Sequence, residues 1–301
     1  MSDTARSAGF WKRNQLKIAP WAFLAPGAIM FLLYVLIPIV QSVWISFHDW
    51  DGLGDKVWIG LGNYVELLDD DTFYVALKNN LIWLALYLLA IPMGLATALF
   101  LNQTVWGIRL YKSLFFFPFV ISQVVVGLMF TWFYAPDFGL FSQLIKWLTG
   151  TEIAVLADER FVTLGIIVAG LWPQTAYCMI LYLTGLNNLN PEQIEAARMD
   201  NARGWRLLWH VILPQLAPAT FIAMVVTVIG ALRSFDLVSI MTAGGPYGSS
   251  QVLSYFMYEQ ALSEYGYRMG YGAAIAVVLF LIMMVFITLF IVRMIAQERN
   301  R

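Results

Sequence analysis

Long apolar runs alternate with short polar segments along the whole chain. A helix that crosses about 30 Å of hydrocarbon needs about 20 apolar residues. Pro26 and Pro38 interrupt the first run, which predicts a tilt or a kink there. We expect six membrane-spanning helices, near residues 21–47, 79–101, 113–135, 161–184, 216–235 and 271–295.

The composition supports a membrane protein. Hydrophobic residues make up 60% of the 301 residues and charged residues 12%, whereas a soluble domain has about 45–50% and about 25%. The one cysteine, Cys178, lies inside an apolar run, so we expect neither a disulfide framework nor a cysteine metal site. No signal-peptide cleavage pattern precedes the first run, so we expect the N-terminal segment to be retained.

Lys and Arg fall unevenly between the two sides of such a bundle. With the N-terminus inside, the inner segments hold twelve of the 18 basic residues and the outer loops hold five, with Arg233 at a boundary. Basic residues collect on the cytoplasmic side. We therefore expect four cytoplasmic segments: 1–20, 102–112, 185–215 and 296–301. The outer loops are then 48–78, 136–160 and 236–270.

The first outer loop is acidic. Two interpretations stay open: a solvated surface with a helix N-cap near Asp71, or a docking surface for a soluble partner. The acidic residues are Asp49, Asp51, Asp55, Glu66, Asp69, Asp70 and Asp71.

A charged, alanine-rich stretch, EAARMDNARG (195–204), lies in the longest inner loop. Asn190 suits an N-cap and Pro191 suits the first helical position. Gly204 is a typical terminator. These signals predict a short helix over residues 191–203.

A second helix is expected over residues 205–213. It would lie at the membrane interface, because its apolar residues fall on one face. These are Trp205, Leu208, Trp209 and Ile212.

The short charged helix has two possible roles. Its alanines let another backbone approach closely, and its charges fix an orientation, which suits insertion into a cleft of a cytoplasmic partner. Alternatively, it is an ordinary loop helix with Glu195–Arg198 and Asp200–Arg203 pairs at i, i+3.

The run EAARMDNARGWRLLWHVILPQLAP (195–218) resembles the EAA loop of ABC importer membrane subunits. One position departs from that pattern, because Asn201 stands where the family usually has Gly. Asn tolerates a left-handed backbone, so we expect the turn to be kept. The matching residues are Glu195, Ala196, Ala197, Asp200, Ala202, Leu213, Pro214 and Pro218.

A second run, FDLVSIMTAGGPYGSSQVLSYFMYEQA (235–261), resembles carbohydrate-uptake permeases of the maltose, glycerol-3-phosphate and multiple-sugar type. The resemblance covers residues 20–295 and implies an all-α type I importer core of six helices with a cytoplasmic coupling helix. The matching residues are Phe235, Asp236, Thr242, Gly244, Gly245, Pro246, Ser249, Ser250 and Tyr258.

The resemblance implies a non-catalytic subunit of a larger machine in the bacterial inner membrane. Its partners would be a second permease subunit, two ATP-binding subunits and a periplasmic solute-binding protein, with a carbohydrate as substrate and lipids around it. The chain has no phosphate-loop motif, so a partner must bind the ATP. We expect no cofactor, metal, catalytic residue or nucleic acid. The residues expected to couple to the ATPase are Glu195, Ala196, Ala197, Asp200, Asn201 and Ala202.

The expected substrate pathway uses polar and aromatic residues within the spans. Each of these residues has the alternative role of interhelical hydrogen bonding or, for Trp172, of an interfacial aromatic. Alignment to the maltose-type pattern puts Ala231 in place of a polar contact and Gln174 in place of Gly, so maltose itself is not expected. The pathway candidates are Gln123, Trp172, Gln174, Tyr177, Thr227, Arg233 and Ser234.

Arg233 leaves three roles open. It would bind an anionic sugar or polyol derivative, pair with Asp236, or extend to the outer surface.

Other classes of function make different demands. A stand-alone secondary transporter predicts intramembrane Asp or Glu, or an inverted repeat. A membrane enzyme predicts acids, or acids with His, gathered at one face. An ABC permease for a non-carbohydrate solute stays the alternative within the family, against which the Gly-Gly-Pro segment argues.

Overall fold

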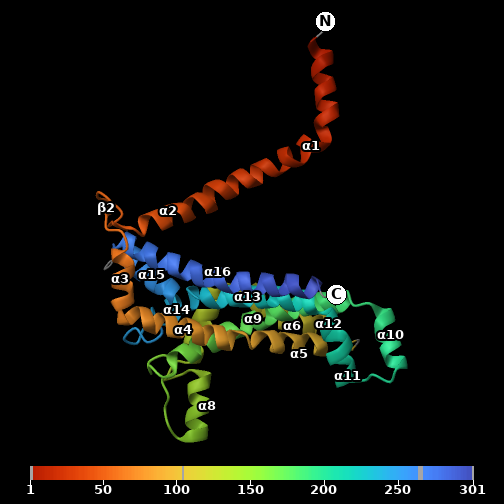
Figure 1. Ribbon diagram of the computed structural model, residues 1–301. Coiled ribbons are helices and arrows are strands. Elements are labelled where there is room, and N and C mark those ends of the chain that lie inside the picture. Colours follow the sequence, from red (N-terminus) through yellow and green to blue (C-terminus); the bar gives the residue numbers. More distant parts are fainter. Residues whose placement is uncertain (1–2, 104, 264–266, 300–301) are drawn as a thin grey trace.

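The computed structural model describes residues 3–103, 105–263 and 267–299 and is almost entirely helical. Long helices run side by side in a bundle (Figure 1). Helices α3 (Gly62–Asp69), α14 (Asp236–Met241) and α15 (Leu253–Leu262) lie at one end, called here the α3 end. Helices α10 (Pro191–Met199) and α11 (Trp205–Leu207) protrude at the other, called the α10 end.

Five helical stretches in the described ranges are long and apolar enough to cross a membrane, and a bent pair gives a sixth if it counts as one span. The predicted all-α membrane fold is confirmed. The five stretches are Ala19–Ile45, Asp71–Leu101, Val162–Asn187, Ala217–Met241 and Met269–Ala296.

The first stretch runs from α1 (Asp3–Phe31) through a π-helical turn, η1 (Leu32–Leu36), into α2 (Ile37–Ile45). The π turn directly precedes Pro38, whose ring clashes with a helical backbone and removes one hydrogen bond. In the first stretch, no residue of the most apolar 18-residue window is buried. Figure 1 shows this helix diverging from the bundle.

The second stretch joins α4 (Asp71–Tyr87) to α5 (Ala90–Leu101). It begins at Asp71, earlier than the expected residue 79, because a cap sets its start: the Asp70 carboxylate accepts from the Thr72 N–H at 2.8 Å. The expected N-cap near Asp71 is thus present.

The third predicted span, 113–135, is not one straight helix. The structure has α6 (Ile108–Val120) and α7 (Gln123–Phe133), bent by 98° at residues 121–122. Ser122 is extended (φ −65°, ψ 147°), and its hydroxyl accepts from the Val125 N–H at 3.4 Å. A serine N-cap starts a new helix here, which the hydropathy pattern does not reveal.

Helix α9 (Val162–Asn187) is the central helix, with half of its most apolar window buried. It packs against α5, α6 and α13 (Ala217–Leu232). The last span, α16 (Met269–Arg299), runs along the bundle surface. The largest fully buried side chains include Trp83, Ile166, Tyr182, Phe256 and Tyr271.

The α3 end is fastened by polar contacts between distant segments. Arg268 pairs with Glu66 at 2.6 Å, and the Tyr271 hydroxyl donates to Asp70 at 2.8 Å. The hydrogen bond that Arg268 donates to the Glu66 carboxylate raises the pKa of Arg268. The strands β1 (His48–Asp49) and β2 (Val57–Trp58) pair antiparallel nearby, with His48 opposite Trp58.

The remaining elements are short. They are α8 (Leu140–Thr149) between α7 and α9, then the π turn η2 (Leu208–Ile212) and α12 (Leu213–Gln215) between α11 and α13. The expected helix 205–213 is therefore a composite of α11, η2 and α12. Of the expected terminal segments, residues 1–2 and 300–301 lie outside the described residues.

Candidate coupling loop and translocation site

The predicted N-cap of α10 is confirmed. The Asn190 side chain accepts a hydrogen bond from the Glu192 N–H at 2.9 Å, and Pro191 is the first helical residue. Proline fits this position because the missing N–H would have no helical partner.

Helix α10 ends differently from the prediction. It stops at Met199, not at residue 203, and Asn201 adopts the left-handed conformation with φ 61°. The Ala202 N–H bonds to the Ala197 carbonyl at 2.9 Å, and the Asn201 N–H bonds to the Arg198 carbonyl at 3.1 Å. These two bonds form a Schellman motif, in which the left-handed residue is usually Gly. Asn201 therefore keeps the turn that the family builds with Gly, as predicted.

The side chains of α10 are free. None of its residues is buried, and Met199 is 87% exposed. In the described part of the chain, ion pairs form only at Lys146–Glu152, Arg160–Asp158 and Arg268–Glu66. The i, i+3 pairs considered for this helix are thus not formed, and its charges stay available to another molecule.

The two ends of the loop are joined at their base. The Asn190 N–H donates to the Gln215 side chain at 3.0 Å. Leu186 at the end of α9 and Leu216 before α13 belong to one buried cluster. Trp205 and Trp209 stack with ring centroids 5.8 Å apart and stay mostly exposed. The loop is a capped helix on a packed base, which suits transmission of movement.

The candidate pathway residues separate into three places, the first of which lies between α9 and α13. Gln174 donates to the Thr227 hydroxyl at 2.8 Å, and the Cys178 sulfur lies 3.7 Å from the same hydroxyl. Thr227 and Cys178 are fully buried. This cluster links the two helices directly.

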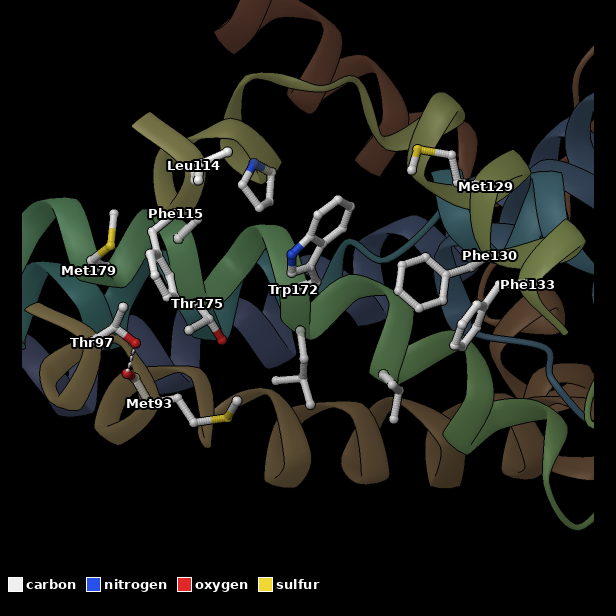
Figure 2. A pocket seen from close by; sticks show the side chains of 14 residues that line it. Met93, Thr97, Leu114, Phe115, Met129, Phe130, Phe133, Trp172, Thr175 and Met179 are labelled. Atoms are coloured by element: carbon white, nitrogen blue, oxygen red, sulfur yellow. Dashed lines mark hydrogen bonds between the residues drawn. The ribbon is translucent and has the colours of Figure 1, made fainter. Parts of the chain in front are cut away.

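The second place is a cavity of about 860 Å³ between α5, α6, α7 and α9. Figure 2 shows Trp172 between the side chains of α6 and those of α7. Its ring lies 6.1 Å from the Phe130 ring, and Tyr177 on the same helix lies 5.3 Å from the Phe119 ring. The lining residues are Met93, Thr97, Leu114, Phe115, Pro118, Met129, Phe130, Phe133, Val168, Leu171, Trp172, Thr175, Ala176 and Met179.

Two buried polar atoms belong to helices around this cavity. Gln123 begins α7 at the bend, and its Oε1 is buried without a hydrogen-bond partner among the described residues. The Thr175 Oγ1 is also buried without a hydrogen-bond partner among the described residues, and Thr175 lines the cavity. A buried polar atom without a partner costs about 1–3 kcal/mol. Of these two residues, Thr175 lines the cavity and Gln123 does not.

The third place is the end of α13. Arg233 caps the helix, is exposed, and forms no ion pair with Asp236 or any other described residue. The Ser234 hydroxyl donates to the Ala231 carbonyl at 2.9 Å. Arg233 lies six residues from Thr227, which is about 9 Å along a helix. The structure therefore does not gather all seven candidates at one point.

The sequence interpretation missed two asparagines that hold the Gly-Gly-Pro segment. The Asn79 side chain donates to the carbonyls of Ser249 and Gln251, at 2.7 and 2.8 Å, and Asn80 accepts from the Leu253 N–H at 2.8 Å. Both asparagines are buried. The signal was present as adjacent asparagines in an apolar run, because buried amides need partners.

The segment is also closed by its own bonds. Ser250 donates to the Gly245 carbonyl at 2.6 Å and lies 2.8 Å from the Thr242 hydroxyl. Gln251 bonds the Glu259 carboxylate, and burial raises the pKa of Glu259.

These features define a class: a multi-pass helical membrane protein with a capped, unburied helix at one end of its bundle. Residues 90–301 match the family described as "Binding-protein-dependent transport system inner membrane component". The chain is 37% identical over 276 residues to the probable ABC transporter permease protein YurN of Bacillus subtilis (strain 168), covering 89% of this chain and 93% of that relative. The chain belongs to this family.

Two further relatives carry more specific names. Identity is 32% over 272 residues to the alpha-glucoside transport system permease protein AglF of Rhizobium meliloti (strain 1021), covering 88% of this chain and 79% of AglF. The chain is also 32% identical over 268 residues to the multiple sugar-binding transport system permease protein MsmF of Streptococcus mutans serotype c (strain ATCC 700610 / UA159). That match covers 87% of this chain and 90% of MsmF.

A solved structure shares the fold. It is a crystal structure of a bacterial ABC transporter involved in the import of the acidic polysaccharide alginate, with a TM-score of 0.78 and 24% identity over 93% of this chain and 98% of that one. The same transporter type in complex with an alginate pentasaccharide-bound periplasmic protein gives a TM-score of 0.79 at 22% identity, over 93% and 95%.

Proposed function

We propose that this chain is a non-catalytic permease subunit of a binding-protein-dependent ABC importer and forms half of the translocation pathway for a sugar, oligosaccharide or sugar derivative. The observation that carries the proposal is α10, a helix capped at both ends, unburied and free of internal ion pairs. The names of AglF and MsmF support a carbohydrate as the substrate.

Helix α10 is the coupling element. Ala196 and Ala197 on the helix, and Ala202 in the turn that follows it, are small and let the groove of an ATPase subunit approach the backbone. Glu195 and Asp200 pair with that subunit, because no described residue of this chain holds them. Asn201 fixes the exit of the chain by its left-handed turn. ATP hydrolysis then belongs to two partner subunits.

The proposal also orients the chain. The α10 end and both termini face the cytoplasm of a bacterial cell, since this arrangement puts twelve of the 18 basic residues inside. The α3 end receives a periplasmic solute-binding protein. A second permease subunit completes the pathway, and the first helical stretch, unburied in its apolar window, leaves a surface free for it.

The sugar passes the cavity beside Trp172. An aromatic face packs on a sugar ring, and Thr175 on the cavity lining offers a hydroxyl. Gln123, at the bend between α6 and α7, belongs to the pathway outside this cavity. Tyr177 continues this wall. Gln174 and Thr227 support the wall from behind through their mutual bond. Arg233 and Ser234 stand toward the α3 end, where substrate enters.

The absence of buried acids among the described residues favours this proposal over a secondary transporter driven by ion coupling, which needs such groups.

The test is ATPase activity of the purified complex, with and without loaded binding protein, for wild type and for Glu195→Ala/Asp200→Ala. We expect the double variant to assemble but to lose stimulation by the binding protein. Glu192→Ala, on the same exposed helix but outside the motif, is the matched control and should keep the stimulation. Normal stimulation in the double variant, or failure of any ATPase to co-purify, would contradict the proposal.

A second candidate substrate class is an anionic sugar or polyol derivative, favoured by the exposed and unpaired Arg233. In that case Arg233→Gln weakens uptake of the anionic substrate at least several-fold, and Arg233→Lys restores part of it. Competition uptake assays with neutral and charged sugars measure this. Unchanged affinity and rate in Arg233→Gln rule out the anionic class.

A further inference from the structure

Helix α8 (Leu140–Thr149) is fastened to the bundle along one side. Its Ser142 hydroxyl donates to the Tyr134 carbonyl at 2.9 Å, and the Phe141 ring lies 5.4 Å from the Tyr134 ring. Ser142 is buried and Phe141 and Ile145 are half-buried. The remaining circumference of the helix points away from the protein.

The free circumference has an apolar face. At about 100° per residue, positions i, i+4, i+7 and i+8 share one side of a helix. Here that side is apolar and open, with exposed fractions of 74% at Leu140, 49% at Leu144, 79% at Trp147 and 62% at Leu148.

The third side of the helix carries polar residues. Gln143 donates to the Asp137 carbonyl at 2.8 Å, and Lys146 pairs with Glu152 at 2.5 Å. Helix α8 therefore has three faces: one on protein, one apolar and one polar.

The direction of α8 identifies what meets the apolar face. Figure 1 shows α8 running across the direction of the long helices, beside the bundle and near the α3 end. When those helices cross a membrane, α8 lies in the membrane plane. An amphipathic helix in this position, with Trp and Leu on one side and Lys on the other, fits the boundary between headgroups and acyl chains.

Apolar side chains are also exposed on the helix that precedes α8. Helix α7 ends at Phe133, and its Leu128 and Trp132 are 45% and 64% exposed. We propose that α8 is an interfacial helix whose Leu140, Leu144, Trp147 and Leu148 insert into the lipid leaflet at the α3 end of the bundle.

The test uses spin labels in the assembled transporter, reconstituted in vesicles of phosphatidylethanolamine and phosphatidylglycerol. A label at Trp147→Cys reports the apolar face, and a label at Lys146→Cys, about 100° further around the helix, is the matched control for the polar face. The native Cys178 is fully buried, and wild type treated with the label checks that it stays unmodified. Electron paramagnetic resonance then compares accessibility to oxygen, which dissolves in lipid, and to a water-soluble nickel chelate.

We expect the ratio of oxygen to nickel accessibility to be at least several-fold higher at position 147 than at 146. Low accessibility of 147 to both reagents would mean that a protein partner covers the face, and would overturn the proposal. Equal nickel accessibility at 147 and 146 would place the face in water, and would overturn it too. A second label at Leu144→Cys guards against local misfolding, since it must follow position 147.

Discussion

At the scale of single residues, Asn201 explains a feature of the coupling-loop pattern. The residue is left-handed and occupies the position in the Schellman motif where helices usually have Gly. The family's Gly is thus required by backbone conformation. Its replacement by Asn is tolerated because Asn enters the left-handed region at small cost.

This gives a graded prediction at residue 201. Asn201→Gly should leave thermal stability and coupling unchanged, whereas Asn201→Val should cost about 1–2 kcal/mol, because a left-handed backbone is strained for residues other than Gly and Asn. Thermal unfolding and ATPase stimulation of the purified complex measure both effects.

Asn188→Val is the matched control, since Asn188 is exposed in the same loop but has a negative φ of −101°. Equal losses for the two valine variants would show that strain at residue 201 is not the cause.

The sequence identified polar residues in the spans but not the directions of their side chains. Gln174 and Thr227 bind each other, while Trp172, two residues from Gln174, lines the cavity. Whether such residues meet substrate or another helix depends on helix rotation. A single helix leaves that rotation undetermined, because its polar positions are too few to define a face.

At the scale of elements, hydropathy located the apolar stretches better than their ends. The start at Asp71 and the bend before Gln123 are both set by caps, at Asp70 and Ser122. A capping residue acts on one or two N–H groups, so a window of about 19 residues averages its signal away.

Asn79 on α4 holds the Gly-Gly-Pro segment through its two hydrogen bonds, and mutation of this residue tests the contact. Asn79→Ala removes the donor of the Gln251 carbonyl and leaves the Ser249 carbonyl with only the 3.3 Å bond from Thr163, which should cost about 1–3 kcal/mol. We expect faster hydrogen–deuterium exchange of backbone amides over residues 243–252. The exposed Asn102, at the end of α5, provides the control Asn102→Ala. Unchanged exchange in Asn79→Ala would show that the hydrogen bonds within the segment are enough to keep its structure.

At the scale of the whole molecule, residues far apart in the chain are joined at the α3 end. Arg268 meets Glu66 across about two hundred residues, and its guanidinium lies 4.3 Å from the Tyr271 ring centroid. No sequence pattern in this single chain predicted that pairing, because it depends on how the first and last spans sit together.

A double-mutant cycle on Arg268→Ala and Glu66→Ala should therefore give a coupling energy of about 0.2–1 kcal/mol, as for other partly exposed pairs. The coupling should fall as salt is added. Lys146→Ala, which breaks a pair between residues only six apart, is the control and should leave the global unfolding temperature unchanged. A cycle with no coupling at low salt would exclude a stabilising role for the Arg268 pair.

The first helical stretch has a consequence for how such a molecule finds its neighbours. No residue of its apolar window is buried by its own chain, yet hydrocarbon tails solvate that window as well as protein would, so its exposure carries little penalty. Association with a neighbouring helix must then depend on close van der Waals packing between the two surfaces. Gly27 leaves room for such a fit, since no other atom lies within 4 Å of where a Cβ of Gly27 would stand. The shape of this helix surface, rather than its hydrophobicity, therefore selects the neighbouring helix.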